Sequence, residues 1–187
     1  SATLFSLSVV DENNVTIGSS GSIPALVSLL REGSSRGKKD AATALFNLSI
    51  YQGNKEKAVR ANVVPPLMSL LVDPSSDMVD EALAILAILT THQEGRTAIS
   101  QASAMPVLVE LLKSGSPRNA AAVLLALCMN DPSLTAQAVQ FGVRGPLIEL
   151  ISIGTTRARR KASSLLEHIN KFDRGSPLLG AYEQTHK

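Results

Sequence analysis

The chain has 187 residues, of which 44% are hydrophobic and 18% charged, and its formal net charge is +2. This composition is typical of a folded globular protein and excludes the disordered class, and so small a net charge does not by itself indicate nucleic-acid binding. Trp is absent and Cys128 is the single cysteine, so the core is aliphatic and a disulfide framework is excluded. Without a signal-peptide pattern or a membrane-spanning run, we expect an intracellular, cytoplasmic protein, with the nucleus as a second compartment.

Four similar proline-containing stretches divide the chain. The first covers residues 21–30, and versions of it return at 62–71, 103–112 and, more loosely, 142–151. Pro24, Pro65 and Pro106 are each 41 residues apart. A fixed period of this length indicates a repeat protein, in which each unit packs against its neighbours. We therefore expect function to lie on a repeated surface.

Residues 1–10 are similar to the end of a repeat. Leu4, Phe5, Leu7 and Ser8 match the residues that lie 41 positions later in the chain. We expect a fragment that begins inside a repeat, and its exposed apolar N-terminal end favours oligomerisation.

The first complete repeat has the pattern of three helices. A short helix is expected around residues 14–19, followed by a turn at Gly21, where the missing Cβ permits a positive φ. A second helix begins with Pro24 at its first position, and a third runs from about Lys38 to Ile50. Later units follow the same plan. The predicted repeats are 1–10 (partial), 13–51, 54–91, 95–129 and 134–172, and a breaker cluster then opens a C-terminal tail at 173–187.

One spacing differs in the third repeat. The start of the second helix and the reference alanine of the third helix are 17 residues apart in three repeats, as from Pro24 to Ala41, but 14 residues apart from Pro106 to Ala120. Two explanations stay open: the connection is shortened near Arg118, or three residues of a mobile loop are missing from the printed sequence.

Three stretches carry a resemblance to a known family. Residues 36–55 (RGKKDAATALFNLSIYQGNK), 80–86 (DEALAIL) and 115–119 (GSPRN) are similar to the armadillo domain of plant U-box E3 ubiquitin ligases. In that family, Arg-Glu-Asn usually follows Pro-Arg-Asn, so this chain departs by the same three residues. The period alone would also suit HEAT repeats.

The resemblance implies an all-α, right-handed armadillo (ARM) repeat solenoid of about four three-helix repeats plus an N-terminal partial repeat. It also implies a protein–protein interaction module that recognises substrates or regulatory partners, such as receptor-like kinases. No stretch resembles a U-box, so we expect the fragment to bind partners without transferring ubiquitin, which the full-length parent would do.

The sequence lacks the patterns of small-molecule chemistry. Residues 33–39 depart from a phosphate-binding loop, and no Ser lies in a Gly-x-Ser-x-Gly motif. His92, His168 and His186 have no metal-ligand spacing with one another or with Cys128. We therefore expect no catalytic residue, cofactor, metal or small-molecule substrate.

The stacked third helices predict a concave surface with two ladders of exposed positions. One ladder contains Thr43, Ala84, Ala122 and Ser164, and the other contains Asn47, Ile88, Ala126 and His168. Nuclear-import armadillo proteins resemble one another in repeating Trp and Asn at these positions, a pattern that this chain lacks. Asn47 has two open roles: it bridges backbone groups of adjacent repeats, or it binds the main chain of an extended ligand.

Basic residues gather where the third helices begin. Such cations oppose the helix dipole, so helix stability does not explain them. They form either a solvated rim or a contact surface for an acidic or phosphorylated partner, and Asp77, Asp80 and Glu81 would divide them into two patches. General scaffolding or nucleic-acid binding is the alternative function. The predicted partner-binding groove contains Lys38, Lys39, Thr43, Asn47, Arg118, Arg159, Arg160 and Lys161.

Overall fold

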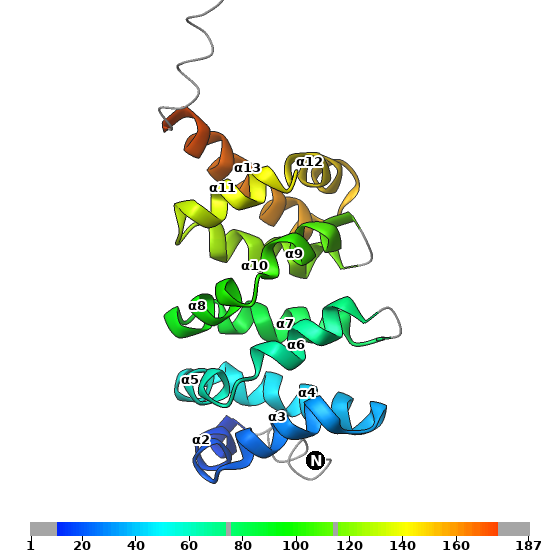
Figure 1. Cartoon of the computed structure of the whole chain (residues 1–187), viewed down its shortest axis with the longest axis vertical. Helices are drawn as coiled ribbons and strands as arrows, with labels where there is room; N and C mark the ends of the chain where they lie inside the picture. The colour runs from blue at the N-terminus through cyan, green and yellow to red at the C-terminus, as the bar shows by residue number, and fades with distance from the viewer. Residues whose placement is uncertain (1–10, 74–75, 114–115, 176–187) are drawn as a thin grey trace, which may run out of the picture. The chain divides into compact units, whose positions relative to one another are not determined.

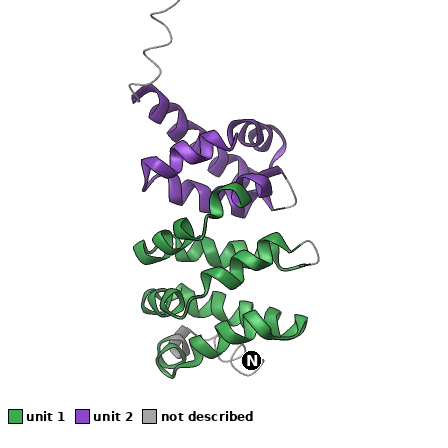
Figure 2. Cartoon of the chain, in the orientation of Figure 1, with its two compact units in different colours: residues 1–107 green, residues 108–187 purple. Residues whose placement is uncertain are grey.

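A computed structural model describes residues 11–73, 76–113 and 116–175, and these residues form helices and connecting turns without a strand (Figure 1). The predicted partial repeat at 1–10 and most of the predicted tail lie outside the described residues. The chain divides into two compact units, residues 1–107 and 108–187 (Figure 2). In the described part, none of the helices has the length and apolar character needed to cross a membrane.

Unit 1 consists of successive three-helix repeats, as the sequence predicted. Helix α4 packs against α3, α5 and α7, and it buries Leu45 and Leu48 completely among them. The apolar faces of adjacent repeats thus form one continuous core. The helices are α2 (Asp11–Ser19), α3 (Ser22–Glu32), α4 (Ser35–Ile50), α5 (Gln52–Arg60), α6 (Val64–Val72), α7 (Val79–Leu89), α8 (Gln93–Gln101) and the beginning of α9 (Ala104–Lys113).

Unit 2 contains the rest of α9 and four further helices: α10 (Pro117–Cys128), α11 (Pro132–Gln140), α12 (Arg144–Ile153) and α13 (Thr156–Gly175). Helix α13 packs along both α10 and α12 and buries Leu165 and Ile169 there. It continues to Gly175, three residues past the predicted repeat boundary at 172.

Four equivalent turns join the first and second helices of the repeats. Gly21 and Gly142 have φ angles of 78° and 77°, and Asn62 and Ser103 have φ angles of 61° and 53°. The predicted positive φ at Gly21 is confirmed. The position predicted for Pro24 is wrong by two residues, because α3 already begins at Ser22. Proline is still tolerated there, since the first-turn N–H groups have no partner within the helix.

The third helices of the repeats begin at different distances from their reference alanines. Helix α4 begins at Ser35 rather than at the predicted Lys38, and the Ser34 hydroxyl caps it by accepting a 3.2 Å hydrogen bond from the Gly37 N–H. The starts of α4 and α13 both lie six residues before their reference alanines, whereas α7 and α10 begin three residues before Ala82 and Ala120. Since α7 has the full 17-residue spacing, the start of α10 does not account for the difference. Relative to the second repeat, the third repeat is shorter in the connection between its second and third helices, which is residues 114–116 compared with 73–78.

Arg144 occupies a position that is apolar in the other repeats. It lies two residues after the positive-φ turn, where Ile23, Val64 and Met105 are buried. Its guanidinium instead forms an ion pair with Asp173 and donates a 3.0 Å hydrogen bond to Asn170. These contacts connect the beginning of α12 to the last turns of α13.

Candidate functional site

The basic residues predicted in unit 1 are not an open cationic patch. On α4, Lys38 is half-buried and Lys39 is exposed. The Lys39 ammonium lies 3.3 Å from the Asp77 carboxylate, so an acidic residue from the next repeat neutralises it. Thr43 is half-buried and its hydroxyl donates a 2.9 Å hydrogen bond to the Lys39 carbonyl oxygen. We expected acidic residues to separate two basic patches. In unit 1, one of these acidic residues, Asp77, instead pairs directly with Lys39.

Asn47 is half-buried on the same helix, one turn after Thr43. It already has an interaction partner within the fold. Ile88, its equivalent on α7, is also half-buried. The two roles of Asn47 stay open, because contacts within the chain do not exclude a ligand contact.

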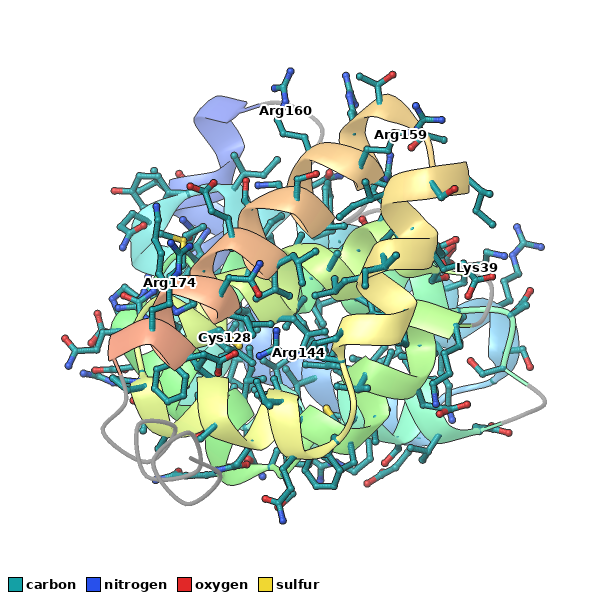
Figure 3. The ribbon with its side chains drawn as sticks, turned by 90° about the horizontal axis from the view of Figure 1, so that it is seen from above. Lys39, Cys128, Arg144, Arg159, Arg160 and Arg174 are labelled. Atoms are coloured by element: carbon teal, nitrogen blue, oxygen red, sulfur yellow. The ribbon has the colours of Figure 1, made fainter. Side chains whose placement is uncertain are left out.

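The basic residues of unit 2 lie at the beginnings of α10 and α13, two helices that pack side by side. Arg118 is exposed on the first turn of α10, and its Nε donates a 3.3 Å hydrogen bond to the neighbouring Asn119. Arg159, Arg160 and Lys161 are exposed near the beginning of α13. Figure 3 shows Arg159 and Arg160 at the end of this helix that lies farthest from Arg174.

Arg159 has a structural role as well as its charge. Its Nε donates a 2.8 Å hydrogen bond to the Gly154 carbonyl oxygen, and its Nη2 lies 3.3 Å from the Ser152 carbonyl oxygen. Carbonyl groups at the end of a helix lack intrahelical partners, so Arg159 caps the end of α12. This side chain is therefore less available to a partner than its exposure suggests.

Three other cations share one face of α13, and we call them the α13 cationic surface: Arg157, Arg160 and Lys161. The spacings i, i+3 and i, i+4 bring their Cβ atoms to within about 6 Å of one another. All three are exposed, and none forms a hydrogen bond or an ion pair with any residue that the structure describes. The first acidic residue of α13 is Glu167, and it pairs with Lys171 at 2.9 Å.

This arrangement is electrostatically unfavourable for the isolated helix. Like charges at these spacings repel by about 0.2–0.5 kcal/mol per pair. Cations in the first turns oppose the helix dipole, at about 0.3–1 kcal/mol each at low salt. The first turn of α13 contains no acidic residue. An anionic group placed against the α13 cationic surface would remove both penalties.

The predicted ladder positions of unit 2 hold two alanines, a serine and a histidine. Ala122 and Ala126 are half-buried and Ser164 is exposed. The fourth member, His168, turns into the fold: its Nε2 lies 3.1 Å from the Cys128 carbonyl oxygen and 3.2 Å from the Thr135 hydroxyl. The histidine therefore binds the end of α10, a contact that the ladder pattern did not predict.

Two hollows in unit 1 lie beside the first helices and away from the predicted groove residues. One, of about 420 Å³, is lined in part by Lys57 and Arg60 of α5. Both cations are already paired, Lys57 with the Ser19 hydroxyl at 3.2 Å and Arg60 with Glu56. Within the described residues, no three His, Cys, Asp or Glu side chains cluster as a metal site would require.

Comparison with models of protein families assigns the chain to one family. The family model of the plant U-box protein ARM repeat region matches residues 3–187. The chain belongs to this family. The predicted family resemblance is thereby confirmed, with a match that includes the segment predicted as a tail.

Curated relatives of this armadillo region agree with the assignment. U-box domain-containing protein 13 of Arabidopsis thaliana is 61% identical over 63 residues, which are 32% of this chain and 10% of that protein. U-box domain-containing protein 12 of Oryza sativa subsp. japonica is 55% identical over 67 residues, 34% of this chain and 11% of that protein. The matches thus cover about a tenth of these relatives.

Solved structures confirm the all-α armadillo fold. A designed armadillo repeat protein superposes with a TM-score of 0.80 at 23% identity, covering 89% of this chain and 72% of the other. An engineered protein superposes with a TM-score of 0.81 at 28% identity, covering 89% and 42%. A third, designed armadillo protein was solved in complex with the peptide (KR)4 and has a TM-score of 0.77 at 22% identity over 89% of this chain and 72% of the other. These superpositions show the fold of the chain, and the bound peptide belongs to that designed protein.

Proposed function

We propose that this chain is the partner-recognition region of a plant U-box E3 ubiquitin ligase. It holds a protein substrate or a regulatory partner, such as a receptor-like kinase, while a U-box elsewhere in the parent protein recruits the ubiquitin-conjugating enzyme. The fragment itself binds and does not transfer ubiquitin. The family assignment supports this proposal, and so does the sequence, which offers no constellation of nucleophile and base. Its place of action is the cytoplasm, and the nucleus as well.

The observation that carries the partner chemistry is the uncompensated charge of Arg157, Arg160 and Lys161. Guanidinium and ammonium groups pair strongly with carboxylates and most strongly with phosphates. In unit 1, by contrast, the exposed Lys39 of the predicted groove is already bound to Asp77. The partner therefore presents an acidic or phosphorylated segment, and it contacts unit 2 through the α13 cationic surface.

The experiment uses three fluorescent peptides of equal length that alternate glycine with glutamate, phosphoserine or glutamine. The purified chain binds the phosphoserine peptide most tightly and the glutamine peptide least. The R157E/R160E/K161E variant loses about tenfold or more in affinity for the two acidic peptides, because each charge-assisted contact contributes about 1.5–3 kcal/mol. The matched control K39E leaves this affinity within about twofold, because Lys39 already pairs with Asp77.

Each other outcome has a defined meaning. Equal affinities of the wild-type chain for all three peptides would overturn the proposed partner chemistry. Tighter binding of a single-stranded RNA oligonucleotide, with a steep loss of affinity as salt rises, would favour the nucleic-acid alternative. Ubiquitin transfer by the chain alone, in the presence of activating and conjugating enzymes, would contradict its role as a binding module.

A further inference from the structure

A serine lies two residues after the last member of the α13 cationic surface, in the order Arg160-Lys161-Ala162-Ser163. The Ser163 side chain is exposed, and its hydroxyl makes no hydrogen bond with any residue in the described ranges. At the same position of the other third helices, Ala42, Leu83 and Ala121 are buried. A free hydroxyl therefore stands where the other repeats place a core residue.

We propose that Ser163 is the phosphorylation site of an arginine-directed serine/threonine protein kinase, and that phosphorylation closes the α13 cationic surface to acidic partners. Kinases of this class recognise basic side chains two and three residues before the acceptor through acidic groups in their peptide groove. Lys161 and Arg160 occupy these two positions. Ser164 is exposed as well, but Ala162 stands two residues before it, so it fits the pattern less well.

The phosphoryl transfer needs ATP as its co-reactant. The Ser163 Oγ attacks the γ-phosphorus of ATP while the bond between that phosphorus and the β,γ-bridging oxygen breaks. ADP leaves, and the serine proton passes to the catalytic base of the kinase. No residue of this chain takes part in the chemistry other than as the acceptor.

A kinase binds its acceptor segment in an extended form, so the beginning of α13 must open. Between Thr156 and Ser164 the only buried side chains are Ala158 and Ala162. Alanine buries little apolar surface, so local opening of these turns sacrifices little hydrophobic stabilisation. Leu165 and Ile169 are fully buried and hold the rest of the helix against unit 2.

The product would have a nearby electrostatic partner. A phosphoserine has a charge of about −1.5 to −2 and three acceptor oxygens. At position 163 it lies one helical turn from Arg159 and Arg160, and only Arg159 is already hydrogen-bonded. Glu167 lies one turn further on and repels the phosphate weakly, because it is paired with Lys171. The phosphate therefore pairs with Arg160 and offsets much of the positive charge of the surface from within the chain.

The first test is phosphorylation of the folded chain by the catalytic subunit of an arginine-directed kinase with ATP, with the site mapped by mass spectrometry. We expect phosphate on Ser163, none there in S163A, and undiminished Ser163 phosphorylation in S164A. R160Q lowers the initial rate by about tenfold or more, because it removes a charge-assisted contact with the kinase, whereas R157Q lies outside the recognised positions and changes the rate less than about twofold. Phosphate on Ser164 instead, or phosphorylation of a free peptide of residues 156–168 but not of the folded chain, would overturn the site.

The second test concerns the effect on binding, which rests on the proposed function. Phosphorylated wild-type chain binds the glutamate and phosphoserine peptides about tenfold more weakly than unmodified chain. Kinase-treated S163A binds them as before. Unchanged affinity after stoichiometric phosphorylation would overturn the switch. If the unmodified chain does not bind these peptides, the proposed partner chemistry and the proposed switch are both wrong. The mass-spectrometric result still decides whether Ser163 is the modification site.

Discussion

The side-chain amide of Asn54 donates a 3.0 Å hydrogen bond to the main-chain carbonyl oxygen of Leu48 in the interior of unit 1. Leu48 lies in the last turn of α4, where carbonyl groups lack the usual helical partner, and its carbonyl oxygen also accepts a longer, 3.3 Å hydrogen bond from the Tyr51 N–H. In unit 2, Thr135, which lies one position further along its helix, donates a 3.0 Å hydrogen bond to the Cys128 carbonyl oxygen at the end of α10. Both donors are completely buried. The first helix of a repeat thus caps the third helix of the preceding repeat.

Replacing Asn54 with alanine leaves the end of α4 without this buried donor. We expect N54A to lower the free energy of unfolding by about 1–3 kcal/mol, measured by urea denaturation. The matched control is N130A, which removes a 2.7 Å bond from an exposed asparagine to the Ala126 carbonyl oxygen. Water replaces that bond, so the control loses less than about 0.5 kcal/mol. Equal losses in the two variants would contradict a special role for the buried cap.

Gly95 occupies the same register position on α8, and there the backbone itself approaches the preceding helix. A Cβ at Gly95 would lie 2.1 Å from the Leu89 carbonyl oxygen. G95A should therefore force a backbone shift and lower the free energy of unfolding by about 1–3 kcal/mol or more. Gly145 is the control because a Cβ there meets no other atom within 4 Å. G145A should leave the melting temperature unchanged or raise it, and a G95A variant as stable as wild type would refute the close approach.

Ser103 has a positive φ of 53°, whereas Gly21 and Gly142 serve the same turn without a Cβ. The left-handed conformation costs a residue with a Cβ about 1–2 kcal/mol, which the greater chain entropy of glycine offsets in part. We expect S103G to stabilise the protein by up to about 1 kcal/mol in thermal unfolding. S100G, within the neighbouring helix α8, should destabilise it by about 0.5–1 kcal/mol. The same sign for both substitutions would argue against backbone strain at Ser103.

Much of the fold could be predicted because the same residue pattern occurs in each repeat. The 41-residue spacing, the αL turn at Gly21 and the apolar face with Leu45 and Leu48 all follow from local periodicity. The predicted starts of the helices were less accurate than the predicted repeat pattern. The Ser34 cap extends α4 by one turn before Lys38, and such a cap depends on side-chain geometry that composition does not show.

The candidate site was less predictable, since it depends on which charges find partners. The sequence showed Lys39 and Arg159 as equivalent basic residues. Lys39 pairs with an aspartate 38 positions away, and Arg159 caps the helix before its own. Only the packing of the helices in three dimensions reveals such contacts. His168 likewise counted as an exposed ladder position until its bond to the end of α10 was known.

Because the Cys128 thiol is buried in unit 2, the stability of the folded protein depends on pH in the alkaline range. Burial raises the pKa of its thiol from 9.0 to about 11, outweighing the opposite effect of the hydrogen bond with Thr135. Above pH 9 the unfolded chain releases this proton while the folded chain retains it, so the unfolded state binds fewer protons and stability falls as pH rises. The loss contributed by this thiol grows between pH 9 and about pH 11 and reaches about 2–3 kcal/mol.

The measurement is urea denaturation of wild type and C128A at several pH values from 7 to 11. Removing the buried sulfur lowers the stability of C128A at every pH, because it leaves a cavity. The decisive quantity is the difference in unfolding free energy between the two proteins, in which the titration of lysines and tyrosines common to both cancels. We expect this difference to be constant below pH 8 and to shrink steadily above pH 9. A difference that stays constant through pH 11 would show that the folded protein leaves the Cys128 thiol free to ionise.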